Sequence, residues 1–280
     1  MSQRCLFFTA VTALILIGAS LMWLRHDRLD IPLIPKNDAP IWLVEARIDF
    51  VALGEETLAS LSLPDNPPGY DIISEQAASP GYGFSRVSNT GHPRGKWSKR
   101  EAAGPQTLYF KAQFAPNDNG STRRDKAGGP PSDPQRIIWE EPQATAAADL
   151  LDTATRRSST PASLTRELIK AVQSPNNQNA ALLLDQHSPQ QLVVRLLNQS
   201  DVPARLAMGL KLEDARRNQS LQPLVDVYID GAWRLYDLDR SGQMGITRNT
   251  LIWHRASGPV LEVMGGQNSQ VRFSMMRQSI

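Results

Sequence analysis

The chain has 280 residues and a formal net charge of +2, from 30 basic and 28 acidic residues. This near balance gives no overall field that would attract nucleic acid, so nucleic acid is not expected as a partner. The single cysteine, Cys5, excludes an internal disulfide, a cysteine-based zinc site and a thiol nucleophile in the rest of the chain. The four histidines stand at no metal-binding helical spacing, and neither a metal nor a cofactor is expected.

An apolar run without charged residues occupies positions 6–24. As a helix at ~1.5 Å per residue it would be about 28 Å long, close to the ~30 Å hydrocarbon core of a bilayer. Trp23 stands where an interfacial aromatic residue would lie, and basic residues flank both ends, so charge does not decide the orientation. We predict a single-pass transmembrane anchor within residues 1–30, with the lipid bilayer as its partner. A cleaved signal peptide is the alternative; the length of the run and the bulky residues after Ala19-Ser20 argue against it.

Residues 31–115 carry the pattern of β-strands. In 41–52, small or apolar side chains alternate with charged ones, and shorter runs at 57–63 and 107–114 repeat the alternation. This period of two is typical of strands with one wet face, and segments rich in proline and glycine separate the runs. We therefore predict a β-rich antiparallel domain over 31–115.

Residues 116–140 are expected to form a flexible linker. The part from 115 to 134 has almost no apolar residue and is dense in glycine, proline, aspartate and asparagine. Such a segment cannot bury enough surface to order itself. We place a domain boundary here, with the second domain over 141–280.

Helical patterns open the second domain. Residues 144–157 are rich in alanine and leucine, and Thr160 before Pro161 predicts the N-cap of a helix over 162–172. Ser188 and Gln191 have the spacing of a capping box, which predicts a further helix ending at Asn198.

A strand and a hairpin are predicted after this helix. A strand is expected over 206–212, and alternating apolar residues then lead to Asp230-Gly231, a strong signal for a two-residue hairpin turn. Pairing about that turn sets Leu224 opposite Asp237. Gln222 and Asp237 then become diagonal neighbours on one face of the hairpin.

The segment 198–237, with its Asp201-Val-Pro-Ala-Arg turn, resembles the core of a transglutaminase-like, papain-related domain. In active members a cysteine opens the helix before this turn, a histidine begins the next hairpin and an aspartate ends it. The resemblance places these positions at or beside Gln186, at Gln222 and at Asp237. A glutamine amide can form hydrogen bonds but is neither a nucleophile nor a proton carrier, so the catalytic cysteine and histidine are replaced. The implied fold class is α+β: an N-terminal transmembrane helix, an antiparallel β domain and an inactive transglutaminase-like α+β domain.

Other segments resemble a bacterial family described as inactive transglutaminases fused to seven transmembrane helices. These segments are 64–70, 79–84, 209–214 with Arg216-Arg217, and 265–269. The resemblance implies a soluble part on the periplasmic side of the cytoplasmic (inner) membrane, and a functional link to an ATP-grasp peptide ligase and a pepsin-like protease. Relatives continue into the multi-helix membrane domain where this chain ends at Ile280, so either a shortened protein or a piece of a longer one is compatible with the sequence.

These observations lead to the hypothesis of a membrane-anchored pseudoenzyme without catalytic residues. Its relict cleft, near Gln186, Ser188, Gln222 and Asp237, is expected to bind a peptide-like ligand or a partner protein. A structural spacer or subunit-contact domain is the alternative.

A residual serine hydrolase is a further, weaker alternative. It would use Ser188 with His187 or His254 as the base. Ser188 already has a role in capping its helix, and the adjacent side chains of His187 and Ser188 diverge at a helix start, so this reading is disfavoured.

Overall fold

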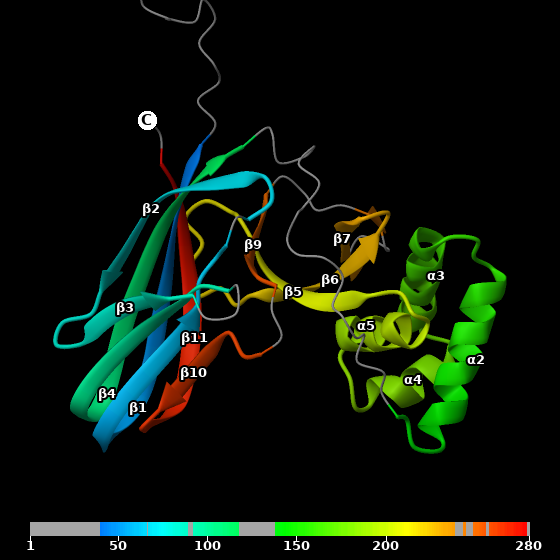
Figure 1. The fold of residues 1–280 in the computed structure, drawn as a ribbon, viewed down its shortest axis with the longest axis horizontal. Helices are drawn as coiled ribbons and strands as arrows, with labels where there is room; N and C mark the ends of the chain where they lie inside the picture. Colours follow the sequence, from blue (N-terminus) through cyan, green and yellow to red (C-terminus); the bar gives the residue numbers. More distant parts are fainter. Residues whose placement is uncertain are drawn as a thin grey trace, which may run out of the picture. The chain divides into compact units, whose positions relative to one another are not determined.

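Residues 40–278 are described by the computed structural model, except 66, 89–91, 118–137, 239–242, 245–248 and 256–257. The segment from Ile41 to Gln278 forms one unit that contains two antiparallel sheets and a group of helices (Figure 1). This content confirms the predicted α+β class. The transmembrane helix predicted within residues 1–30, and most of the predicted linker, lie outside the described residues. In the part that is described, no helix is both long and apolar enough to cross a bilayer.

The first sheet is built on two long strands that pair with each other along their length. Its members are β1 (Ile41–Ser62), β2 (Tyr70–Ala78), β3 (Gly83–Val87), β4 (Arg94–Pro116), β10 (Leu261–Met264) and β11 (Gly266–Gln278). Strands β2 and β3 pair with β4, while β10 and β11 pair with β1. The two runs predicted at 41–52 and 57–63 are a single strand, β1, whose register against β4 shifts between Leu53 and Thr57.

The last two strands belong to this first sheet. We assigned them to the domain over 141–280, but β11 pairs antiparallel with β1 from Ile41 opposite Gln278 to Ala52 opposite Gly266. The physical reason is burial: Phe273 and Met275 of β11 fill the core of the first sheet. The chain therefore returns to its first sheet after it has completed the second.

The core of the first sheet lies on one face of β1 and β4. Alternate residues of β1 from Val44 to Ala52 are buried, as the predicted period of two requires. Trp253, from the second sheet, enters the same core beside Phe273, with ring centroids 4.8 Å apart. Its Nε1 donates a hydrogen bond to the backbone oxygen of Ser62 at 2.8 Å. The two sheets are therefore joined by buried contacts.

Four helices follow the first four strands. They are α2 (Gln143–Arg156), α3 (Pro161–Gln173), α4 (Gln178–Leu184) and α5 (Pro189–Gln199) (Figure 1). The predicted N-caps are confirmed: Thr160 begins α3 in a reciprocal pair with Ser163, and Ser188 begins α5 in a capping box with Gln191. Helix α4 was not predicted; it has only about two turns, and Asn177 caps its N-terminus.

The second sheet has the strand order β8-β7-β6-β5-β9. Its strands are β5 (Ala204–Lys211), β6 (Gln222–Ile229), β7 (Ala232–Asp237), β8 (Gln243–Met244) and β9 (Thr250–His254). The predicted hairpin is confirmed: Asp230 and Gly231 both have positive φ, 53° and 76°, and Ile229 pairs with Ala232. The register runs on to Val225 opposite Tyr236, as the prediction of Leu224 opposite Asp237 requires.

The two faces of the second sheet have different roles. Val225, Val227 and Tyr236 share a buried core with helices α2 to α5, and α5 packs against β5 and β6. Leu224 and Leu235 project to the other face. By the same alternation, Gln222 and Asp237 belong to this second face.

Candidate functional site

The residues expected at the relict site come from two regions of the fold. Gln186 is exposed in the turn between α4 and α5, and Ser188 is the N-cap of α5. The Ser188 hydroxyl accepts a hydrogen bond from the backbone nitrogen of Gln191 at 3.3 Å, and Gln191 Oε1 accepts one from the Ser188 nitrogen at 3.0 Å. The first-turn amide that could face a nucleophile is therefore already occupied by the cap.

Gln222 and Asp237 lie on strands of the second sheet. Gln222 begins β6 opposite Gly209 of β5, and Asp237 ends β7 opposite Gln243 of β8. The register of the β6–β7 hairpin puts both side chains on one face, as predicted. Gln222 is exposed and lines a pocket to which Gln186, Ser188 and Asp237 do not contribute.

Both histidines of the weaker hydrolase reading have other partners. His187 Nε2 accepts a hydrogen bond from Arg195 Nη1 at 2.7 Å, so this nitrogen is not available as a base for Ser188. Burial, and then the Arg195 charge, lower the pKa of His187 below its ordinary value. His254 Nδ1 lies 2.5 Å from the Ser62 hydroxyl, in the buried junction of the two sheets. These contacts do not place either imidazole as a base for Ser188.

A buried ion cluster lies on the same sheet face as Gln222 and Asp237. The carboxylate of Asp226 is fully buried, 3.0 Å from Arg205 Nε and 3.7 Å from Arg255 Nε. The Arg205 guanidinium also stacks on Trp233, 3.7 Å from the ring centroid. Arg205 and Asp226 stand opposite each other in the β5–β6 ladder. A buried carboxylate requires such partners, so the cluster fixes the register of the two strands that carry the candidate site.

This cluster is not among the predicted site residues. The turn ending in Arg205 was recognised, but no partner was assigned to it. The available signal was an acidic residue, Asp226, between two buried valines in a strand, because a carboxylate in such a position requires a counter-charge.

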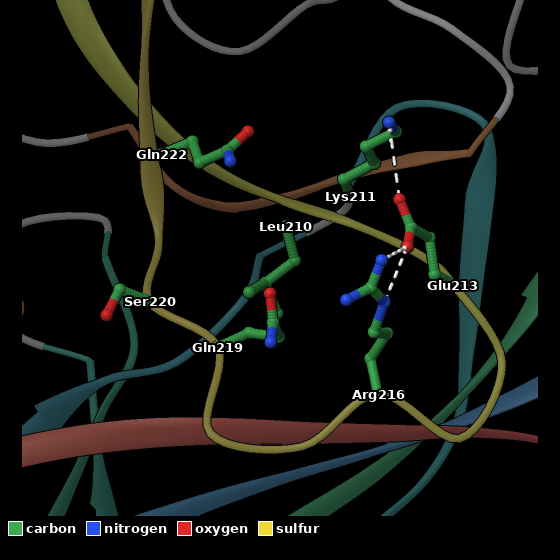
Figure 2. Close-up of a pocket in the computed structure, with 7 residues that line it drawn as sticks. All are labelled: Leu210, Lys211, Glu213, Arg216, Gln219, Ser220 and Gln222. Carbon is green, nitrogen blue, oxygen red and sulfur yellow. Dashed lines mark hydrogen bonds and ion pairs between the residues drawn. The ribbon is translucent and has the colours of Figure 1, made fainter.

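The pocket that Gln222 lines lies where β5 ends and β6 begins. It has a volume of ≈ 170 Å³. Figure 2 shows its lining residues: Leu210, Lys211, Glu213, Arg216, Gln219, Ser220 and Gln222. The pocket therefore combines a relict position with polar and charged side chains from one loop.

An ion network occupies one side of the pocket (Figure 2). Glu213 Oε2 accepts a hydrogen bond from Nε of Arg216 at 2.6 Å and forms an ion pair with Nη2 of the same residue, also at 2.6 Å. Glu213 Oε1 lies 3.2 Å from Lys211 Nζ. Hydrogen bonds from Lys211 and then Arg216 lower the pKa of the Glu213 carboxyl, which is therefore an anion at neutral pH. Two cations and one carboxylate leave the pocket lining with a formal charge of +1.

The loop that carries this network is tied to β11. The backbone nitrogen and oxygen of Gln219 exchange hydrogen bonds with Phe273, each 2.8 Å long, and the Arg216 oxygen accepts one from Met275 at 2.9 Å. Asp214 Oδ1 accepts a further bond from the Arg277 nitrogen at 2.8 Å. The return of the chain to the first sheet thus positions the pocket.

Among the residues that the structure describes, no three His, Cys, Asp or Glu side chains are grouped so that they could hold a metal ion.

A family model described as "Inactive transglutaminase fused to 7 transmembrane helices" matches residues 24–187 of the chain. The match covers β1 to β4 and α2 to α4 and reaches Gln186; Ser188, Gln222 and Asp237 lie beyond it. No curated protein sequence matches the chain.

Two solved structures align with the chain at low sequence identity. The crystal structure of a proposed cysteine protease from Cytophaga hutchinsonii aligns with a TM-score of 0.52 at 12% identity, over 86% of this chain and 99% of that one. A proposed protease from Parabacteroides distasonis aligns with a TM-score of 0.25 at 12% identity, over 70% of this chain and 46% of that one. The first likeness supports a common fold and nothing more specific.

Proposed function

The chain belongs to the family of inactive transglutaminases fused to seven transmembrane helices, and from this premise we propose that it is a membrane-anchored, non-catalytic module that binds a peptide-like ligand. The observation that carries the proposal is the position of Gln222. The resemblance puts the catalytic histidine there, and the carboxamide is exposed and lines a polar pocket. An amide at this place can hold a peptide group by donating and accepting hydrogen bonds.

The absence of catalysis follows from the chemistry of the replacements. Neither Gln186 nor Gln222 can supply a thiolate or carry a proton, and the only cysteine of the sequence is Cys5, far from the site in the chain. Loss of general acid–base help alone typically lowers a rate by ~100 to 10,000-fold. Asp237, the third relict position, then has no imidazole to orient.

The membrane anchor and the location outside the cytoplasm are parts of the same proposal. They are supported by the apolar run at 6–24 and by the membrane helices in the family description. We also propose that the module works with an ATP-grasp peptide ligase and a pepsin-like protease. Reporter fusions after residue 30 and at the C-terminus would report the side on which the soluble part lies, and a cytoplasmic signal at both would contradict the proposed location.

Binding and catalysis are tested on the same 280-residue chain in detergent. Isothermal titration with short peptides is expected to show binding that Gln222→Ala weakens and that Gln76→Ala, a change at another exposed glutamine, on β2, does not alter. Asp237→Ala tests the third relict position in the same way. No turnover of peptide or ester substrates is expected. Turnover by the parent protein would overturn the non-catalytic assignment, and a peptide whose affinity is the same for the parent and Gln222→Ala would remove this site from the proposal.

A further inference from the structure

The β5–β6 pocket carries positive charge that peptide-group binding does not use. Lys211 and Arg216 are 64% and 58% exposed, and both are paired with the one carboxylate of Glu213. Asp214 and Arg217 belong to the same loop but do not line the pocket, and the Asp214 carboxylate accepts from the Arg277 backbone. The lining therefore has one cation more than it has anions.

Hydrogen-bond donors remain on both cations after the contacts with Glu213. The hydrogen bond to Glu213 uses one of the five N–H donors of Arg216; Nη2 of Arg216 and Nζ of Lys211, which carries three donors, lie in ion-pair contact with the same carboxylate. The side chains of Ser220 and Gln222 line the same pocket and can also donate. The pocket is thus rich in donors and has a single strong acceptor group, Glu213.

We propose that this pocket is a carboxylate subsite, in which Lys211 and Arg216 bind a carboxylate of the peptide-like ligand while Gln222 donates to the same ligand. The inference rests on the proposed function and names the chemical group that the pocket selects. Guanidinium and ammonium groups are the usual partners of carboxylates in proteins. A formal charge of +1 matches a monoanion, whereas a phosphate dianion would meet stronger repulsion from Glu213.

The backbone supports this role because the loop is held at Arg216 and again three residues later, at Gln219. Gln219 is bonded in both directions to Phe273, and the oxygen of Arg216 itself is bonded to Met275. A ligand then meets donors that are already placed, which lowers the entropic cost of binding.

The test compares four probes by saturation-transfer NMR titration of the full chain in detergent. N-acetyl-Gly-Gly offers a terminal carboxylate, N-acetyl-Glu-Gly-amide offers a side-chain carboxylate, N-acetyl-Gly-Gly-amide has neither, and acetate is the carboxylate alone. At least one carboxylate peptide is expected to bind about tenfold more tightly than the neutral amide, with a preference that rising salt reduces. The better of the two carboxylate peptides identifies the source of the group.

Substitutions in the ion network are expected to change the affinity for the carboxylate probes in opposite directions. Arg216→Gln and Lys211→Gln are expected to weaken binding of the carboxylate probes several-fold, while Glu213→Gln is expected to strengthen it, because it removes the competing anion. The side chains of all three lie at the surface, so the variants should fold. Matched controls are Arg156→Gln, Lys170→Gln and Glu167→Gln, which alter exposed ion pairs of α2 and α3 by the same charges.

The outcomes separate this inference from the proposed function. Equal affinity for the neutral amide and both carboxylate peptides overturns the subsite and leaves peptide binding intact. Acetate binding that Arg216→Gln abolishes, with no binding of any peptide, keeps the subsite and overturns peptide binding. If no probe binds, or if Glu213→Gln weakens the carboxylate probes, the subsite is refuted.

Discussion

The junction of β10 and β11 gives a sharp test of the fold. Gly265 lies there with a φ of 69°, and a Cβ at this position would be 2.2 Å from the backbone oxygen of Glu56 in β1. The left-handed conformation costs an L-residue roughly 1 to 2 kcal/mol. Moving the backbone away would also weaken the hydrogen bond from the Leu53 nitrogen to the Gly265 oxygen, 3.1 Å long, which is worth ~1 kcal/mol. We therefore expect Gly265→Ala to lower the free energy of unfolding by about 3 kcal/mol or more.

Gly231 provides the matched control. Its φ is 76°, but no atom lies within 4 Å of the position that its Cβ would take. Gly231→Ala should therefore cost only the conformational part, about 1 kcal/mol. Urea unfolding of both variants in the full chain, followed by tryptophan fluorescence, measures the difference. Equal costs for the two variants would refute the close approach of the β10–β11 junction to β1.

Three further predictions concern buried or partly buried polar groups. Asp226→Asn should lower the free energy of unfolding by ~3 kcal/mol, because it removes the carboxylate that Arg205 and Arg255 share; urea unfolding measures the loss. Tyr236→Phe should leave stability unchanged or raise it by up to about 1 kcal/mol in the same assay, because the buried hydroxyl has no hydrogen-bond partner among the described residues. The pKa of His187 is lower in the folded state than its ordinary value of ~6.5, so the folded state binds fewer protons than the unfolded state just below that pH. The contribution of His187 to stability is therefore present above pH ~6.5 and is lost as the pH falls through the lowered pKa. In a plot of the urea midpoint against pH, His187→Gln should flatten the slope below pH ~6.5.

Each of these predictions has a comparison that could contradict it. Asp49→Asn alters an ion pair with Arg47 near the surface and should lower the free energy of unfolding by less than about 1 kcal/mol. An equally small loss for Asp226→Asn would contradict the prediction that the buried ion cluster stabilises the fold. Tyr82→Phe removes a 3.1 Å hydrogen bond to Gln106 and should be destabilising, in contrast to the change at position 236. An unchanged pH profile in His187→Gln would show that another group causes the acid sensitivity.

The features that the sequence predicted correctly are those decided by neighbouring residues. The caps at Thr160 and Ser188 depend on side chains three positions away, and the turn at Asp230-Gly231 depends on two residues that tolerate positive φ. The same turn also fixed the register that puts Gln222 and Asp237 on one face. Helix α4 escaped prediction because two turns give too little periodicity, although its capping residue, Asn177, was a usable signal.

Long-range pairing could not be read from the sequence. The sequence pattern of β11 does not identify its partner strand. Its pairing with β1 depends on the free edge of β1 and on the burial of its apolar side chains in the core of the first sheet. The same limit applies to the candidate site, because the loop with Arg216 and Gln219 takes its shape from hydrogen bonds to β11. The partners of Arg205 and Asp226 likewise depend on a cross-strand register that propensity alone does not specify.

The loss of catalysis that we propose extends beyond the two replaced side chains. Gln186 lies in an exposed turn before α5, and Pro189 opens that helix after a capping box formed by Ser188. A helix N-terminus lowers the pKa of a thiol only when its unpaired amides face the sulfur. Here the cap already takes the amide of Gln191. A thiol at position 186 would therefore lack a base at position 222 and would find the amide of Gln191 already bonded to the cap.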